Sequence, residues 1–255
     1  MRIATLVTII VFSWGNSACV TEGEVQMAPA SDAEQANANL ALGIGYLQEE
    51  RPDLAVEALV RAVDADPRSA DAHSVLAVAY DQTESFTLAE EHHRRAAQLA
   101  PRSFNTQNSI AVFLCRRNRW PEAEPFFDRA ISVSEGPAAT TAMKNAADCA
   151  RGNGDLESAE RFFRAVLDVN GRDAVALRGM MDVSIRSGNF STGRAFWQRL
   201  ESSVSVLPGD LLGCYVIEKG LQDDSAARNC ADRLREEFPG SPEYARVREL
   251  ERNAS

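Results

Sequence analysis

Small residues recur along the chain at a fixed spacing. Alanine or glycine returns after 34 or 36 residues, at Ala55, Ala89, Ala123, Ala159 and Gly193. Twelve residues before these positions stand Gly43, Ala77, Ala111, Ala147 and Met181. Seven residues after them stand Ala62, Ala96, Ala130, Val166 and Leu200. A sustained period of this length predicts a stack of similar structural units.

The positions of the small residues predict a pair of antiparallel helices in every unit. Two helices approach closely only where the facing side chains are small, because ridges on one helix then enter grooves on the other. Larger apolar side chains would fill the remaining space, and the candidates are Leu42, Leu59, Leu76, Phe127 and Phe163. Each pair leaves an apolar flank for the next pair to cover. We therefore expect an all-α solenoid.

The period resembles that of the tetratricopeptide repeat, which implies a right-handed superhelix of about six helix pairs. We expect a solenoid over residues 36–253, with repeats near 36–69, 70–103, 104–139, 140–173, 174–207 and 208–241. The register weakens after Leu200, so the sixth repeat is predicted to be divergent. A polar helix after residue 241 would cap the stack, because solenoids need a polar end.

The beginning of the chain does not follow the repeat. An apolar run from Ile3 to Trp14 follows Arg2, and it is too short to cross a bilayer about 30 Å thick as a helix. We interpret residues 1–18 as a lipoprotein-type signal peptide. Residues 19–35 lack periodicity and predict a flexible tether.

The sequence NSAC, which ends at Cys19, resembles a bacterial lipobox. The resemblance implies that Cys19 is acylated after cleavage and anchors the protein in membrane lipid. Val20 follows the cysteine where an Asp would favour inner-membrane retention, so the outer membrane is expected. Asn16 departs from the usual lipobox residue, and ordinary signal-peptidase cleavage after Ala18 is the alternative.

Composition and charge narrow the classes of function. The formal net charge is −10 and no basic cluster occurs, whereas nucleic-acid binding needs Lys and Arg to displace counterions from phosphates. No Ser/His/Asp or Cys/His arrangement and no glycine-rich phosphate loop has support. A murein-cleaving transglycosylase would need a catalytic domain for which the repeats leave no room. We expect a monomeric protein that is not an enzyme and has no cofactor.

Four cysteines besides Cys19 allow three pairings. Cys115 and Cys149 lie on the first helices of consecutive repeats, and Cys214 and Cys230 lie on the two helices of the last repeat. In an oxidising compartment, each of these two pairs could form a disulfide if its Cα atoms lie within about 7 Å. The alternative is that they are small buried thiols.

Histidines do not support a metal site. No C-x-x-C spacing occurs, and His73, His92 and His93 lie on other helices than the cysteines. His92 and His93 adjoin two arginines on the second helix of the second repeat, so we expect both in a solvated outer face.

In tetratricopeptide-repeat proteins, the first helix of each pair builds the inner surface. The register then predicts a partner-binding groove of Asn37, Leu40, Ile44, Leu47, Val78, Asn108 and Val112. Its apolar members form a strip, and such a patch marks a partner surface that would take an extended or helical peptide. The alternatives are that the tether covers the strip or that the strip belongs to the core. The fourth repeat turns polar, at Lys144, Asp148 and Arg151.

A narrower resemblance rests on four segments. They are ACVTEG, FLCRRNRWPEAEPFFDRAI, NAADCARGNGDLESAERFFRAVL and LREEFPGSPE. Together they are similar to the PilF/PilW family of type IV pilus biogenesis and stability lipoproteins, also called pilotins, over roughly residues 19–245. Asn16, Asn118 in place of a turn glycine, and the cysteine pair of the last repeat depart from the family pattern.

The resemblance implies an outer-membrane lipoprotein that faces the periplasm. Such a protein binds the type IV pilus secretin, brings it to the outer membrane and promotes its multimerisation. The alternative from the same class is a repeat lipoprotein adaptor for another envelope machine, such as outer-membrane protein assembly or cell division. The alternative from another class is an accessory to an enzyme or a murein hydrolase.

Overall fold

The computed structural model describes residues 31–253, and all its regular elements are helices. They are α1 (Asp32–Gln48), α2 (Pro52–Ala65), α3 (Ala70–Gln82), α4 (Phe86–Leu99), α5 (Phe104–Arg116), α6 (Trp120–Ser132), α7 (Gly136–Gly152), α8 (Leu156–Val169), α9 (Ala174–Arg186), α10 (Phe190–Glu201), α11 (Pro208–Gly220), α12 (Asp224–Glu237) and α13 (Pro242–Asn253). The predicted signal peptide and Cys19 lie outside the described residues.

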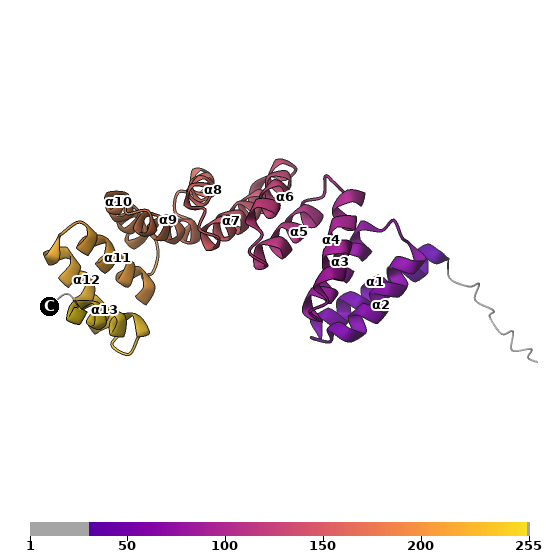
Figure 1. The fold of residues 1–255 in the computed structure, drawn as a ribbon, viewed down its shortest axis with the longest axis horizontal. Coiled ribbons are helices and arrows are strands. Elements are labelled where there is room, and N and C mark those ends of the chain that lie inside the picture. The colour runs from indigo at the N-terminus through magenta and orange to yellow at the C-terminus, as the bar shows by residue number, and fades with distance from the viewer. Residues whose placement is uncertain (1–30, 254–255) are drawn as a thin grey trace, which may run out of the picture.

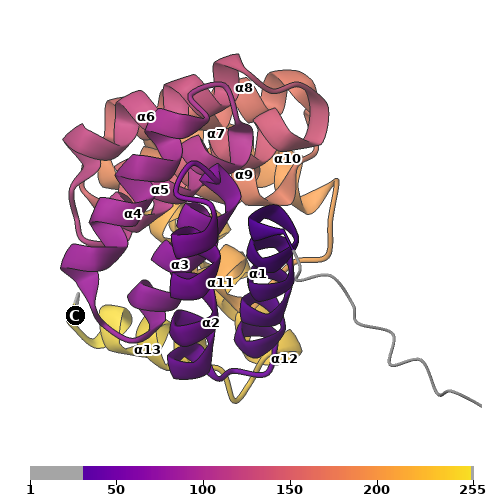
Figure 2. The same ribbon diagram turned by 90° about the vertical axis from the view of Figure 1, so that its right-hand side faces the viewer.

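The helices form six antiparallel pairs that follow one another along the long axis of the molecule, and α13 packs against the last pair (Figure 1). Seen along that axis, the successive pairs turn clockwise as they recede from the viewer (Figure 2). The stack is therefore a right-handed superhelix. The predicted fold class is confirmed.

One turn residue in each repeat marks the period more sharply than the alanines do. Between the two helices of every pair, one residue has a positive φ, between 56° and 85°: Glu50, Glu84, Asn118, Gly154, Gly188 and Gln222. Their spacing of 34 or 36 residues matches that of the small residues. The sixth repeat thus keeps the register that the sequence analysis found weakened there.

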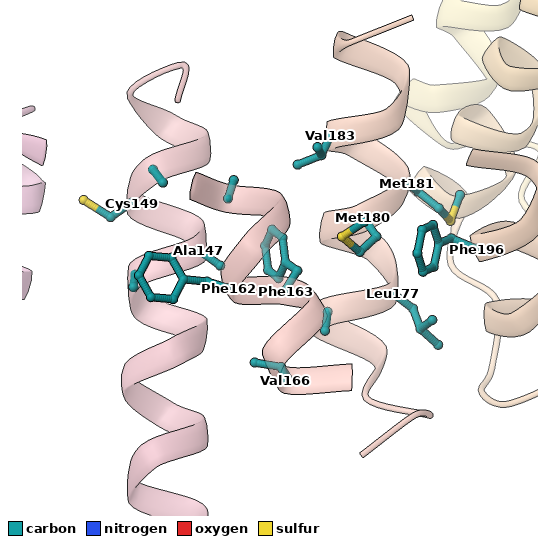
Figure 3. Packing of buried hydrophobic residues seen from close by; sticks show 14 of the residues in the cluster. Ala147, Cys149, Phe162, Phe163, Val166, Leu177, Met180, Met181, Val183 and Phe196 are labelled. Carbon is teal, nitrogen blue, oxygen red and sulfur yellow. The ribbon is translucent and has the colours of Figure 1, made fainter. Parts of the chain in front are cut away.

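The predicted small positions are buried in all five repeats to which they were assigned. At three glycines the approach is too close for a side chain: a Cβ on Gly43 would lie 2.4 Å from Leu59, one on Gly179 would lie 2.2 Å from Phe163 and one on Gly220 would lie 2.5 Å from Phe190. Figure 3 shows Phe163 inserted between α8 and α9 in the continuous core of the later repeats. Small residues therefore set the distance between helices, and one large side chain fills the gap.

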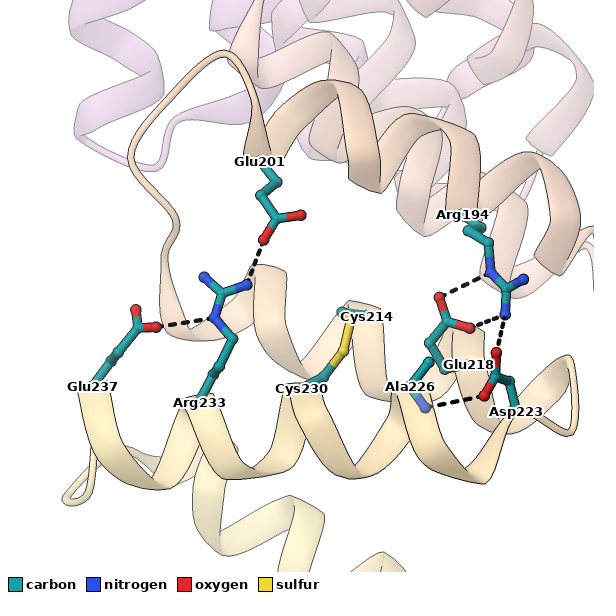
Figure 4. Close-up of a disulfide and its surroundings, with 9 residues drawn as sticks. All are labelled: Arg194, Glu201, Cys214, Glu218, Asp223, Ala226, Cys230, Arg233 and Glu237. Carbon is teal, nitrogen blue, oxygen red and sulfur yellow. Dashed lines mark hydrogen bonds and ion pairs between the residues drawn. A yellow bond between two sulfur atoms is a disulfide. The ribbon is translucent and has the colours of Figure 1, made fainter.

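Two disulfides join helices, in the two pairings that the sequence analysis favoured. Cys115 and Cys149 connect α5 to α7 across a repeat boundary, with Cα atoms 5.6 Å apart. Cys214 and Cys230 connect α11 to α12 within the last repeat, with Cα atoms 6.1 Å apart (Figure 4). For loops of 34 and 16 residues, the lost entropy of the unfolded chain corresponds to stabilisation of about 4 and about 3 kcal/mol.

Three predicted details were wrong. Leu42 was expected in the core, but 43% of its surface is exposed. The tether was predicted to extend to residue 35, but α1 already begins at Asp32. There the Ser31 hydroxyl accepts a hydrogen bond from the Glu34 N–H, and the Glu34 carboxylate accepts one from the Ser31 N–H, which form a capping box.

The start of the fourth repeat also differs from the prediction. Helix α7 begins at Gly136 instead of residue 140. With 17 residues, α7 is about one turn longer than α5, which has 13, and Pro137 lies in its first turn, where a missing N–H costs little.

Candidate partner-binding surface

The first helices of the pairs form the inner face of the superhelix. Successive first helices contact one another, from α1 to α3 and onward to α11 and α13. In the described part of the chain, successive second helices have no Cα atoms within 8 Å of one another. The spacing is therefore tighter along the first helices, which places them on the concave side.

The N-terminal part of the predicted groove is partly exposed and partly buried. Ile44 and Val78 are 38% and 36% exposed, and both are among the exposed large apolar residues of the protein. Leu40 and Leu47 are half-buried against a small core cluster of Ala55, Leu59, Leu76 and Ala79. Asn37 is exposed near the start of α1. The strip thus has an accessible half and a packed half, and its role in partner binding stays a prediction.

A pocket between α3 and α5 brings three of the seven predicted groove residues together. It has a volume of about 270 Å³, and Val78, Asn108 and Val112 line it. The predicted residues of the first repeat are not among its lining residues. We call this cavity the repeat 2–3 pocket. Its remaining lining is polar, aromatic or charged: Asp81, Gln82, His93, Ser109, Phe113 and Arg116.

An arginine packs against one side of the repeat 2–3 pocket. The Arg117 guanidinium stacks over the rings of Phe86 and Phe113, at 4.1 and 3.9 Å from their centres, and donates a 2.5 Å hydrogen bond to Asp81. Arg116 donates a second hydrogen bond of 3.3 Å to Asp81. The carboxylate in the pocket wall is therefore neutralised by two cations, which leaves side-chain amides and a hydroxyl to orient a ligand.

His93 forms the back of the repeat 2–3 pocket. Its ring is 3% exposed and packs against Phe113 with ring centres 5.0 Å apart. Burial lowers its pKa from 6.5 to about 4, against the opposing effect of the Asp81 carboxylate. The imidazole is therefore neutral at neutral pH, and its Nδ1 has no hydrogen-bond partner among the described residues.

The prediction that His92 and His93 lie in a solvated outer face is wrong, because His93 is buried and His92 contacts a third histidine, His73. His73 is buried and His92 is half-buried, and their Nδ1 atoms lie 2.8 Å apart. The His73 Nε2 lies 3.2 Å from the carbonyl oxygen of Pro67, which can only accept. Neutral His73 then carries its hydrogen on Nε2, and His92 donates to its Nδ1. Burial lowers the pKa of both rings.

The middle of the inner face is polar, and its charges bind one another. Lys144 donates to Asp173 at 2.7 Å, and Arg151 donates to Asp148 and Asp182 at 3.0 and 3.2 Å. Each of these ion pairs except Arg151–Asp148 joins helices of different repeats or a helix to the next repeat's cap. The middle of the groove therefore offers side-chain hydrogen bonds but little apolar surface.

A second inner-face pocket, which was not predicted from the sequence, lies between α9 and α11. Its volume is about 390 Å³, and its apolar lining consists of Met181, Ile185, Leu212, Gly213 and Val216. We call it the repeat 5–6 pocket. The signal was present: one further step of 34 residues beyond Met181, Gly193 and Leu200 leads to Tyr215, Ala227 and Leu234, all of which are buried.

Residues 31–253 contain neither a candidate metal site nor a candidate membrane-spanning helix. No group of three or more His, Cys, Asp or Glu side chains is placed to hold a metal ion. No helix in this range combines the length and the hydropathy that crossing a membrane requires.

Comparison with protein families identifies the repeat. A tetratricopeptide-repeat model matches residues 40–104, and a second one matches residues 102–170, so the two matches together cover about half of the chain. The chain is a tetratricopeptide-repeat protein. A comparison with curated protein sequences gives no match.

Several solved structures resemble this tetratricopeptide-repeat chain over most of its length. PilF of Pseudomonas aeruginosa has a TM-score of 0.66 and 24% identity, over 87% of this chain and 100% of PilF. PilW, described as a widely conserved type IV pilus biogenesis factor, has a TM-score of 0.66 and 25% identity, over 83% of this chain and 97% of PilW. YrrB, a tetratricopeptide-repeat protein with an unusual peptide-binding site, has a TM-score of 0.61 but only 11% identity, so it supports the fold alone.

Proposed function

We propose that this protein is a non-enzymatic lipoprotein scaffold of type IV pilus biogenesis, of the PilF/PilW kind. In this proposal, acylated Cys19 anchors the chain in the outer membrane, with the repeats in the periplasm. The inner face binds a segment of the pilus secretin, which promotes localisation of the secretin to the outer membrane and its multimerisation. The acyl chains determine where the complex lies, and the groove determines what it holds.

The extent of the likeness to PilW supports the proposal most directly. The match spans nearly all of PilW and most of this chain, so it covers most of the stack and not only the shape of one repeat. The tetratricopeptide repeat is also found in unrelated scaffolds, and a likeness limited to two or three repeats would carry less weight. Two disulfides add support, because they persist in oxidising compartments such as the periplasm.

The inner face supports binding of a peptide segment. Ile44 and Val78 expose apolar surface on α1 and α3, and Val78 lines the repeat 2–3 pocket, where Asn108 and Ser109 supply hydrogen-bonding groups. In an extended peptide segment, apolar side chains could pack on these apolar residues, and the backbone could form hydrogen bonds with the side-chain amides. We propose Ile44, Val78 and Val112 as the contact residues, with Leu40 and Leu47 as half-buried support.

The competing proposal is an adaptor for another envelope machine, such as outer-membrane protein assembly or cell division. Deletion of the gene separates the two. The pilus proposal predicts loss of SDS-resistant secretin multimers and of twitching motility, with outer-membrane protein levels unchanged. Normal multimers and motility in the deletion strain would exclude the pilus role and leave the scaffold fold unaffected.

The groove assignment has its own test. Ile44→Asp combined with Val78→Asp should reduce capture of the secretin at least tenfold, because two desolvated carboxylates would face apolar partner side chains. The matched control is Leu42→Asp, which changes a residue of similar exposure on the opposite side of α1. All three sites are exposed, so each change should cost less than about 1 kcal/mol of stability. Equal capture by the double variant and the control would refute the assignment.

A further inference from the structure

The repeat 5–6 pocket occupies the same place in its repeats as the repeat 2–3 pocket does. Adding 104 to a residue number moves from the second or third repeat to the same position in the fifth or sixth, as Ala77 to Met181 and Ala111 to Tyr215 show. By this step Asn108 becomes Leu212, Ser109 becomes Gly213 and Val112 becomes Val216. The two cavities are therefore repeat-equivalent, and polar side chains of one are replaced by apolar side chains or glycine in the other.

The charged groups around the repeat 5–6 pocket are paired with one another. The Arg178 guanidinium donates hydrogen bonds of 2.8 and 2.9 Å to the two oxygens of the Asp210 carboxylate, which is almost fully buried. Asp182 accepts from Arg151 at 3.2 Å and lies 3.8 Å from Arg186. A charged ligand group would lose its hydration on entering the pocket and would find no unpaired opposite charge there. The pocket therefore favours an uncharged ligand group.

The floor of the pocket is open because one position has no side chain. A Cβ on Gly213 would lie 3.1 Å from the Met181 Cε and 3.8 Å from the Ile185 Cδ1. The side chains of Met181, Ile185, Leu212 and Val216 surround the space that this glycine leaves. A volume of about 390 Å³ with this lining has room for a large aliphatic side chain.

We propose that the repeat 5–6 pocket is a second peptide-docking site, which takes a large aliphatic side chain, such as leucine, from an uncharged stretch of a partner peptide that lies along the inner face. The paired charges exclude acidic and basic side chains, and the apolar lining supplies the affinity. This inference does not depend on the secretin being the partner.

Methyl NMR of the purified protein with two synthetic probes tests the proposal. The probes are the acetylated and amidated peptide Gly-Ser-Gly-Leu-Gly-Ser-Gly and its counterpart with Asp in place of Leu. The leucine peptide should shift the methyl signals of Ile185, Leu212 and Val216 in a saturable way. The aspartate peptide should bind at least tenfold more weakly, because its carboxylate finds no unpaired cation.

A matched pair of variants shows whether the shifts come from binding in this pocket. Leu212→Asn installs the residue type of the repeat-equivalent position and should weaken the leucine peptide at least tenfold. Val175→Asn makes the same class of change at an exposed residue of α9 outside the pocket lining, and binding should stay within twofold of wild type. If Leu212→Asn fails to fold by circular dichroism, Gly213→Ser replaces it, since the flexible end of Met181 can yield to the new Cβ.

Three results would overturn the proposal. They are an absence of saturable shifts with the leucine peptide, equal binding of the two peptides, and equal binding by the pocket variant and the Val175→Asn control. The probes contain no secretin sequence, so such a failure would leave the proposed function standing. Conversely, loss of the pilus role in the deletion test would leave a positive peptide result intact.

Discussion

The two inner-face pockets occupy one position of the repeat and have opposite chemistry. In the repeat 2–3 pocket, Asp81, Asn108 and Ser109 stand where the repeat 5–6 pocket has Ile185, Leu212 and Gly213. The exchange also runs the other way at one position, because the equivalent of Val78 is Asp182. Val112 and Val216 are alike. The repeat fixes where a cavity lies, and the inner-face residues determine what the cavity can bind.

The difference is possible because the inner-face positions do not hold the helices together. The small residues that set the helix spacing face the partner helix and are buried in both regions. The residues that differ most between the pockets, such as Asn108 and Leu212, are not among these contact positions, so they can change from polar to apolar without altering the stack. A solenoid can therefore carry sites of different specificity along one surface.

The largest expected difference between the two regions is in their stability at low pH, which should fall more around the repeat 2–3 pocket. Because burial lowers the His93 pKa from 6.5 to about 4, the unfolded chain takes up a proton below pH 6.5 while the folded protein stays neutral down to about pH 4. Stability contributed by neutral His93 is complete above pH 6.5 and is lost as the pH falls through this window. Wild type should lose about 3 kcal/mol from this residue by pH 4, at 1.36 kcal/mol per pH unit.

The variant His93→Gln isolates this effect, since glutamine does not titrate. The difference in unfolding free energy between pH 7 and pH 4, measured with urea, should be smaller in the variant by about that amount. The three histidines of the sequence, at positions 73, 92 and 93, lie on α3 and α4. Hydrogen exchange, corrected for the intrinsic rate, should therefore show α3–α5 losing protection in acid while α9–α11 keep theirs. If wild type and variant lose the same unfolding free energy between pH 7 and pH 4, His93 does not contribute to the acid sensitivity.

The ion pairs at the two pockets should differ in their contribution to stability. Arg178→Met leaves the Asp210 carboxylate, whose side chain is 5% exposed, without its cation, and should cost about 3 kcal/mol. Arg116→Met removes a cation whose side chain is 67% exposed, and Asp81 keeps Arg117, so the cost should stay below about 1 kcal/mol. Chemical denaturation of both variants at pH 7 provides the comparison. Equal losses would show that burial of the carboxylate is not the deciding factor.

The sequence was sufficient for the fold because the repeat imposes the same packing constraint many times. Each buried alanine, such as Ala55 or Ala123, satisfies one close helix contact, and five copies of the pattern make its register unambiguous. The wrong prediction for Leu42 also comes from the register of the repeat. Leu42 adjoins Gly43, which faces the partner helix, and a shift of one residue on a helix turns a side chain by about 100° away from that contact.

The candidate binding surface could be predicted only in part. The register placed Val78, Asn108 and Val112 correctly on one face, and the structure brings them into one cavity. It could not show that Leu40 and Leu47 are half-buried against their own repeat, because the curvature of the stack decides how much of each inner-face side chain is covered. The buried histidines were missed for a related reason: adjacent arginines suggested water, but His93 points between α4 and α5 and packs on Phe113.

The smallest expected effect concerns the turn residues that end the two pocket helices. Glu84 closes α3 with φ at +58°, and the repeat-equivalent Gly188 closes α9 with φ at +75°. A side chain at positive φ costs on the order of 1 kcal/mol, and a Cβ on Gly188 would have no heavy atom within 4 Å, so only the backbone opposes it. Gly188→Ala should therefore lower the free energy of unfolding by about 1 kcal/mol. Glu84→Gly should raise it by about 0.5 kcal/mol, because glycine relieves the backbone but adds entropy to the unfolded chain. Urea unfolding measures both changes, and a loss of stability in Glu84→Gly would show that the Glu84 side chain contributes more than its backbone conformation costs.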